Sequence, residues 1–116
     1  GKAAMANASG ADYFLSIHRN SSPYDNQYTG VESLVYSKNG IARTIAENIN
    51  RELTRVGFVN QGIQERPNLA VLRRTDMPAV LVEVGFINTD KDNIRFDTQF
   101  QEIARAIANG LLKSIS

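Results

Sequence analysis

The stretch VLVEVGF at residues 80–86 decides the fold of this chain. It is short, rich in β-branched residues and apolar apart from Glu83. This composition predicts a strand that is buried on both faces of a sheet. Desolvating an ionised carboxylate costs several kcal/mol, so a carboxylate in such a strand needs a partner or a chemical role.

A second run, YFLSIH at residues 13–18, has the same character and ends on the only histidine of the chain. We predict that it is also a strand buried on both faces. Ligands of open α/β sheets bind outside the carboxyl ends of the strands, so His18 and Glu83 are expected to share one site. Two structural alternatives stay open: a single histidine is often only a hydrogen-bonded residue, and Arg73 or Arg74 could pair with Glu83.

Length and composition limit the class of protein. The 116 residues suit one domain with a hydrophobic core. The formal net charge is +1, with acidic and basic residues interleaved, so nothing indicates nucleic acid or an anionic membrane as a partner. The absence of cysteine excludes disulfides and thiolate metal sites. No apolar stretch approaches the length of a membrane span, and the first residues do not resemble a signal peptide.

The rest of the chain predicts strands alternating with helices, which indicates an α/β sheet with helices packed on it. Residues 19–30 are expected to form a loop rich in turn residues, and residues 31–36 a strand. A helix is predicted over residues 40–56, with a stop signal at Gly57. Its apolar residues form one stripe at helical spacing, namely Ile41, Ala42, Ile45, Ala46, Ile49, Leu53 and Val56.

Four further segments are assigned from weaker patterns. Residues 60–68 are expected to form a loop, and residues 89–96 a loop with a short helical piece. The last helix is expected to start at Asp97 or Thr98, where Thr98-x-x-Gln101 fits a capping box. Its predicted buried stripe consists of Phe100, Ile103, Ala104, Ile107 and Leu111. The opening residues 2–9 contain good helix formers without a preceding cap, so we expect the back half of a helix in a chain truncated at its N-terminus.

Two motifs resemble one known family. Residues 11–21 (ADYFLSIHRNS) are similar to the second zinc-histidine motif of the zinc-dependent N-acetylmuramoyl-L-alanine amidases, which also occur as bacteriophage endolysins. Residues 78–88 (PAVLVEVGFIN) resemble the catalytic-glutamate motif of that family, and residues 69–73 (LAVLR) resemble the segment before it. The similarity runs along the whole chain in the same order. It implies an amidase/phosphorylase-hydrolase-like α/β fold, with a mixed, largely parallel sheet flanked by helices.

The resemblance also implies a reaction. The expected enzyme is a peptidoglycan hydrolase that cuts the amide between N-acetylmuramic acid and the L-alanine of the stem peptide. It would use Zn²⁺ bound by His18 to activate a water, with Glu83 as general base and then general acid. Arg19 and Asn20, next to His18, are expected to bind substrate. Such an enzyme acts at the cell wall, outside the cell, or is phage-encoded and released from the host cytoplasm.

The metal site departs from the family pattern. A catalytic zinc ion normally has three protein ligands, and the family takes the other two, a histidine and a glutamate, from sequence upstream of the position of His18. Neither residue type occurs upstream of His18 here. We therefore expect residues 1–116 to be a partial catalytic domain, covering about its last two-thirds, that lacks its N-terminal strand and first zinc ligands. We expect it to bind no catalytic zinc and to be inactive by itself.

Arg19 is a second departure from the family pattern, because many relatives carry a small residue at its position.

Two other functions stay open at this point. One is a non-catalytic peptidoglycan-binding or regulatory fragment of the same fold. The other is a structural fragment that self-associates through an exposed sheet edge.

Overall fold

Four strands form one sheet in the computed structural model, which describes residues 1–116. The strands are β1 (Phe14–Asn20), β2 (Val31–Val35), β3 (Asn60–Glu65) and β4 (Ala79–Phe86), in the order β1-β4-β2-β3. β1 pairs with β4, and β2 with β3, in parallel, whereas β2 and β4 are antiparallel. The sheet is therefore mixed and largely parallel, as the resemblance implies.

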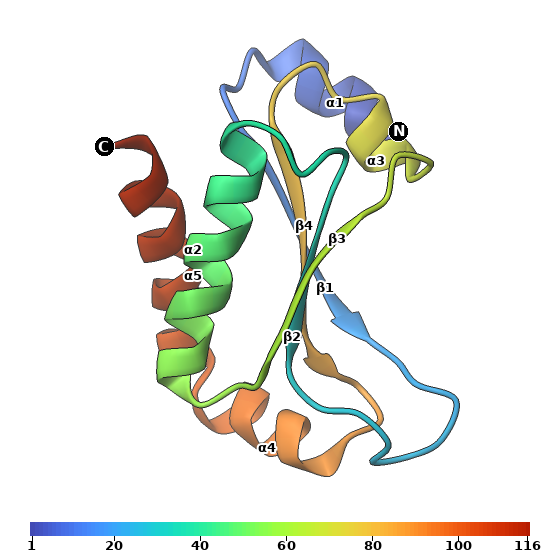
Figure 1. Cartoon of the computed structure of the whole chain (residues 1–116), viewed down its shortest axis with the longest axis vertical. Coiled ribbons are helices and arrows are strands. Elements are labelled where there is room, and N and C mark those ends of the chain that lie inside the picture. Colours follow the sequence, from blue (N-terminus) through green and yellow to red (C-terminus); the bar gives the residue numbers. More distant parts are fainter.

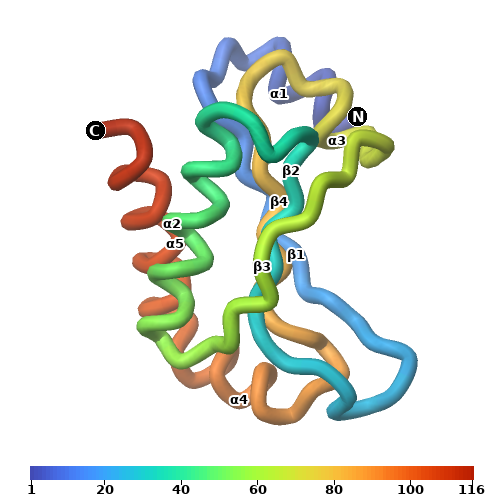
Figure 2. The backbone as a smooth tube through the Cα atoms, in the orientation of Figure 1, coloured from blue at the N-terminus to red at the C-terminus, as the bar shows by residue number.

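Five helices lie along one side of this sheet and at its two ends (Figure 1). They are α1 (Lys2–Ser9), α2 (Ile41–Val56), α3 (Ala70–Arg73), α4 (Asp90–Thr98) and α5 (Phe100–Ile115). α2 and α5 lie together on one side of the sheet, α1 and α3 lie at one end of it, and α4 lies at the other end (Figures 1 and 2). None of the helices has the length and apolar character needed to cross a membrane.

The face of the sheet toward α2 and α5, here called the covered face, carries the main core. Side chains alternate between the two faces of a strand, so every second residue of β4 and β2 points toward the helices. The predicted stripe of α2 packs against them, with Ile45, Ala46, Ile49 and Leu53 buried. A Cβ atom on Gly110 of α5 would lie 2.6 Å from Ile49 Cα, so this glycine allows the two helices to pack closely. The buried strand residues are Val31, Val35, Val80, Val82 and Val84.

The opposite face, here called the open face, is covered only in part. A smaller apolar cluster lies there, consisting of Leu34, Leu72, Ala79 and Leu81. Leu72 belongs to α3, so this short helix covers the start of β4 and the end of β2. Beyond this cluster the open face becomes polar.

The prediction that residues 13–18 are buried on both faces is wrong. β1 lies at the edge of the sheet and has β4 as its single neighbour, so Ile17 stays 56% exposed. β1 also continues to Asn20 and β4 to Phe86. His18 and Glu83 therefore lie within the carboxyl-terminal halves of their strands and not at the ends. β4 itself is buried along almost its whole length, as predicted.

The loop predicted over residues 60–68 is also wrong in its first part, because Asn60–Glu65 forms β3. β3 is the other edge strand, and only Ile63 of its side chains packs against the main core. Gly62 adopts a φ of +93°, and the register against β2 shifts around it. An edge strand with one packed side chain and a bulge shows no alternation of polar and apolar residues, so its sequence does not indicate a strand.

The last two helices differ from prediction in extent and cap. Residues 90–98 form the nine-residue helix α4, longer than the short piece expected, and α5 starts at Phe100. The capping box is absent, because the Thr98 hydroxyl donates back to Ile94 O at 2.7 Å and Gln99 is the N-cap residue without a side-chain cap bond. Phe100 and Ala104 are exposed. The stripe that α5 buries consists of Ile103, Ala106, Ile107 and Gly110.

Candidate active site

Three ionisable side chains lie next to one another across three strands of the open face. His18 of β1 is the register partner of Glu83 of β4, and Glu83 is also the partner of Glu32 of β2. Their strand neighbours Val82 and Val31 point to the covered face, so alternation places these three on the open face. We call His18, Glu83 and Glu32 the polar row. The structure thus brings His18 and Glu83 together, and it adds Glu32.

The His18 imidazole is exposed and held from one side. Its Nε2 atom and Ser16 Oγ are hydrogen-bonded at 2.8 Å. Ser16 precedes it by two residues on the same strand, so both side chains share a face. The Nδ1 atom has no hydrogen-bond partner in the protein. A ring oriented through one nitrogen and free at the other is the arrangement in which histidine binds a metal or carries a proton.

Glu83 is half-buried and forms no salt bridge. Arg73 and Arg74, the partners that a purely structural role would need, form no ion pair with it. Burial raises the pKa of the Glu83 carboxyl above its ordinary value; the charge of His18 opposes this shift and the charge of Glu32 adds to it. A carboxyl group whose pKa is raised toward neutral pH is well suited to take up and return a proton.

Glu32 is the site residue that the sequence analysis missed. It is half-buried and forms neither an ion pair nor a side-chain hydrogen bond in the structure. Like charges directly opposite one another on neighbouring strands are destabilising, so the pairing with Glu83 costs stability. The available signal was the same as for Glu83, a single charged residue in a strand that is otherwise mostly apolar. The antiparallel pairing of β2 with β4, which places the two side by side, is not visible in the sequence.

Arg19 does not lie with His18. Its Nε atom donates to Val84 O at 2.7 Å, and its Nη2 atom donates to Asn93 Oδ1 at 2.7 Å and more weakly to Phe86 O at 3.4 Å. The guanidinium also lies 4.2 Å from the centroid of the Phe96 ring. Successive residues of a strand point to opposite faces, and Arg19 accordingly links β1 to the end of β4 and to α4. Its Nε and Nη2 donors are thus directed at protein atoms.

Asn20 ends β1 and starts the loop to β2, which projects away from α2 and α5 (Figure 1). Its Oδ1 atom accepts the Ser21 N–H at 2.8 Å. Asn88, which follows β4, holds this loop: Oδ1 accepts the Ser22 N–H at 3.1 Å, and Nδ2 donates to Ser22 O at 2.8 Å. The chain leaving β1 is therefore fixed to the turn after β4, beside the polar row.

Asp92 of α4 locks the strands that carry the two carboxylates. It is completely buried and accepts hydrogen bonds from the Thr29 hydroxyl at 2.6 Å, the Gly30 N–H at 3.0 Å and the Phe86 N–H at 2.8 Å. Gly85 has a φ of +76°, and a Cβ atom there would lie 2.9 Å from Asp92 Cβ. The aspartate thus joins the start of β2 to the end of β4, which fixes Glu32 and Glu83 relative to each other.

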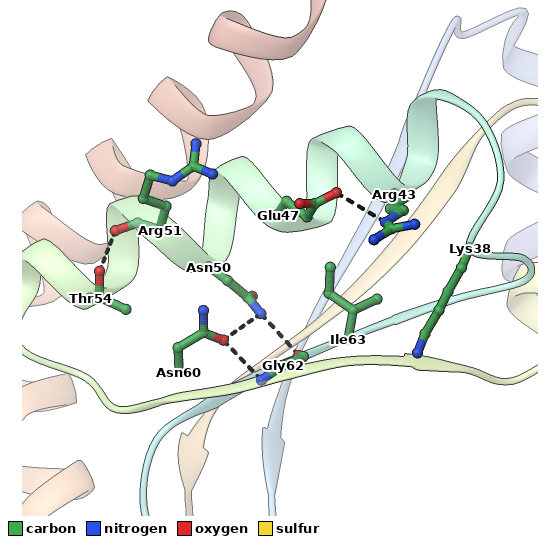
Figure 3. A pocket seen from close by; sticks show the side chains of 9 residues that line it. All are labelled: Lys38, Arg43, Glu47, Asn50, Arg51, Thr54, Asn60, Gly62 and Ile63. Atoms are coloured by element: carbon green, nitrogen blue, oxygen red, sulfur yellow. Dashed lines mark hydrogen bonds and ion pairs between the residues drawn. The ribbon is translucent and has the colours of Figure 1, made fainter.

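A polar hollow of the surface lies elsewhere, between α2 and β3 (Figure 3). It has a volume of about 360 Å³. Its cations do not converge: Arg43 pairs with Glu47 at 3.1 Å, and Lys38 and Arg51 lie toward opposite ends of the view in Figure 3. The hollow is separate from the polar row, because α2 lies on the covered face.

Asn50 of α2 lies at the floor of this hollow and is buried. Its Nδ2 atom donates to Asn60 Oδ1 at 3.0 Å and to Gly62 O at 2.9 Å, and its Oδ1 atom accepts the Ser33 hydroxyl at 2.7 Å. One side chain of α2 therefore binds both β2 and the bulged segment of β3. The polar groups of this region satisfy one another.

The side chains present fit one ligand position of a zinc site. His18 provides one imidazole nitrogen, but no group of three histidine, aspartate, glutamate or cysteine side chains comes together in residues 1–116 in a way that could hold a metal ion. Zinc sites of the catalytic type use three protein ligands. His18 can therefore be one member of such a set, and the remaining members are not among the described residues.

Comparison with known proteins gives consistent matches. The family model described as N-acetylmuramoyl-L-alanine amidase matches residues 1–113. N-acetylmuramoyl-L-alanine amidase CwlM of Bacillus licheniformis is 39% identical over 115 residues, which are 96% of this chain and 44% of that protein. The endolysin of Bacillus phage SPP1 is 30% identical over 122 aligned residues, covering 99% of this chain and 44% of the endolysin. The crystal structure of an N-acetylmuramoyl-L-alanine amidase from Clostridium difficile 630 superposes with a TM-score of 0.87 at 31% identity, covering 98% of this chain and 63% of that one. The chain thus spans less than half the length of these two curated relatives.

Proposed function

Because the chain belongs to the N-acetylmuramoyl-L-alanine amidase family, we propose that it forms part of an enzyme that hydrolyses peptidoglycan. The bond cleaved is the amide between N-acetylmuramic acid and the L-alanine of the stem peptide. The observation that carries this proposal is the pairing of His18 with Glu83 on the open face. In this pairing an imidazole nitrogen without a hydrogen-bond partner lies beside a carboxyl group that forms no salt bridge.

His18 would occupy one position of the zinc site through the ring nitrogen that Ser16 leaves free. The other protein ligands would come from outside residues 1–116. Zinc, when bound, supplies a water of lowered pKa and polarises the scissile carbonyl. Ser16 keeps the imidazole plane fixed, as the hydrogen-bonding partners of ligating histidines do in other zinc sites.

Glu83 would carry the proton of the reaction. It accepts a proton from the attacking water and then delivers it to the nitrogen of the leaving amine, while the carbon–nitrogen bond breaks and the muramoyl carboxylate forms. The raised pKa of its carboxyl supports both steps, because the group holds a proton more readily than an exposed glutamate does. Its place beside His18 supports the same assignment.

The two predicted substrate contacts differ in their surroundings. Arg19 directs its donors at Val84, Phe86 and Asn93, so we propose that it positions the end of β4 behind Glu83. Asn20 stands where β1 enters the loop beside the polar row and is the better candidate for direct contact with substrate. Peptidoglycan is the proposed partner and the cell wall the proposed place of action, for a bacterial or a phage-encoded enzyme.

The test uses the full-length gene product, meaning the protein that contains residues 1–116, loaded with zinc and incubated with purified cell walls. We expect new L-alanine N-termini without new reducing sugar ends, and loss of this activity after chelation. New reducing ends alone would identify a glycosidase and contradict the proposal. Binding to walls without release of L-alanine N-termini would instead support a non-catalytic peptidoglycan-binding module.

A further inference from the structure

Glu32 is the member of the polar row that the proposed reaction leaves without a role. It lies on β2, one strand beyond Glu83 and two strands beyond His18, so the three side chains form a line across β1, β4 and β2. Neighbouring strands are about 4.8 Å apart. Glu32 is therefore close enough to the reacting bond to contact the same substrate, and it belongs to no group of three side chains that could hold a metal ion.

No side chain of the protein forms a hydrogen bond or an ion pair with the Glu32 carboxylate. Two residues of β3, Gln61 and Gly62, lie opposite Glu32 where the register shifts. The Gln61 amide donates to Thr29 O at 2.7 Å, and Gly62 has no side chain. No side-chain donor therefore reaches Glu32, although a carboxylate facing Glu83 would be stabilised by one.

The order of the row gives the substrate a direction. In the proposed reaction His18 would hold the metal that polarises the scissile carbonyl, and Glu83 would deliver the proton to the leaving nitrogen. The peptide thus continues from Glu83 in the direction of β2 and Glu32, while the sugar side lies toward β1. An extended peptide advances about 3.3–3.6 Å per residue, so the amide after the first peptide residue comes within reach of the next strand.

We propose that Glu32 is a specificity residue that accepts a hydrogen bond from the substrate's backbone N–H one residue beyond the cleaved bond. This inference rests on the proposed function, because the direction of the peptide follows from the roles of His18 and Glu83. A hydrogen bond to a charged acceptor changes affinity by about 10- to 100-fold. Glu32 would thus distinguish muramoyl peptides of at least two residues from muramoyl-L-alanine.

The experiment compares two muramoyl dipeptides with the zinc-loaded full-length gene product. One carries the N–H at its second amide, and the other carries an N-methyl group there. We expect the parent protein to prefer the N–H substrate by about 10- to 100-fold in kcat/KM. In Glu32→Ala the preference should fall toward unity, and in Glu32→Gln, whose amide oxygen is a weaker acceptor, it should be intermediate. Glu102→Gln, which removes an exposed carboxylate from α5, is the matched control and should keep the parent preference.

The proposal is overturned if Glu32→Ala keeps the parent preference, or if it slows both substrates equally. A second measurement separates this from failure of the proposed function. Binding of the two dipeptides is measured in the Glu83→Gln background, with and without Glu32→Ala. If the parent protein cleaves neither dipeptide, but in the Glu83→Gln background the N–H ligand binds more tightly only when Glu32 is present, the role of Glu32 stands and the proposed reaction fails. Equal binding of both ligands contradicts the role of Glu32.

Discussion

The covered and open faces of the sheet are made from the same strands but carry different kinds of side chain. On the covered face, Val80, Val82 and Val84 of β4 are completely buried against α2 and α5. On the open face, the residue between the last two of these valines is Glu83, which stands between His18 and Glu32.

Successive side chains of a strand point to opposite faces of the sheet. The same strand can therefore place core residues on one face and the residues of the proposed site on the other. The covered face contributes apolar burial, which favours folding. The open face holds two facing carboxylates, one with a raised pKa, and this arrangement costs stability. Substitutions on the covered face should therefore change the free energy of unfolding, and substitutions on the open face should change mainly the activity.

The largest effect is expected from Glu83→Gln on the open face. In the full-length gene product this change should lower amide hydrolysis by about two to four orders of magnitude, because it removes the proposed proton carrier. Zinc content and the circular dichroism spectrum should stay unchanged, since glutamine has nearly the same shape. Near-normal hydrolysis by the variant would contradict the proposed role of Glu83 and the assignment of the active site to the open face.

A comparison of neighbouring residues on β1 should show the next largest effect. His18→Ala should lower zinc affinity by about 100-fold or more, because loss of a ligand costs more than the 10- to 100-fold typical of residues around it. Arg19→Ala should keep zinc, because its guanidinium faces α4. Metal analysis after dialysis measures both. Equal loss of zinc from the two variants would mean that the two faces are not separated at this point.

On the covered face, Gly110→Ala should lower the free energy of unfolding by about 1–3 kcal/mol. The new Cβ atom would lie 2.6 Å from Ile49 Cα, so α5 and α2 would have to move apart. The control is Ala108→Gly, at an exposed position of the same helix, which measures the helix propensity difference alone. Urea denaturation gives both values. A stabilised Gly110→Ala variant would show that the helices are not closely packed at this glycine.

The smallest effect is the stability change of Glu83→Gln in metal-free protein. The raised pKa means that the folded state binds this proton more tightly than the unfolded state, so ionisation of Glu83 destabilises the fold at neutral pH. The variant should therefore melt at a higher temperature than the parent at pH 7. The difference should shrink as the pH falls through the folded pKa and vanish below the ordinary glutamate pKa. A variant that melts lower at pH 7 would contradict this direction.

The parts of the fold that the sequence predicts well are those that burial alone determines. The strand over residues 80–86 and the helix over residues 40–56 follow from a continuous apolar run and from an apolar stripe, and the structure contains both as β4 and α2. β3 has neither signal, because one packed side chain, Ile63, is enough for an edge strand. α4 begins around the buried carboxylate of Asp92, which no hydrophobic pattern reveals.

The candidate site also contains residues that the sequence predicts and residues that it does not. The pairing of His18 with Glu83 could be predicted because both stand in apolar runs and resemble family motifs. Glu32 could not, because its place depends on the antiparallel pairing of β2 with β4, and strand order is a property of the whole fold. Alternation along β1 predicts that Arg19 points away from His18, but the partners of its guanidinium on β4 and α4 depend on the whole fold.

The amide of Asn50 also determines how β3 can lie against its neighbour. Strands with polar residues on both sides specify their register weakly and are prone to slippage. A slip of one residue would turn Ile63 outward and move Gly62 O away from Asn50, leaving a buried donor unpaired at a cost of about 1–3 kcal/mol. The hydrogen bonds of Asn50 on α2 thus select one register of β3 against β2, although the side chains of β3 by themselves would permit several.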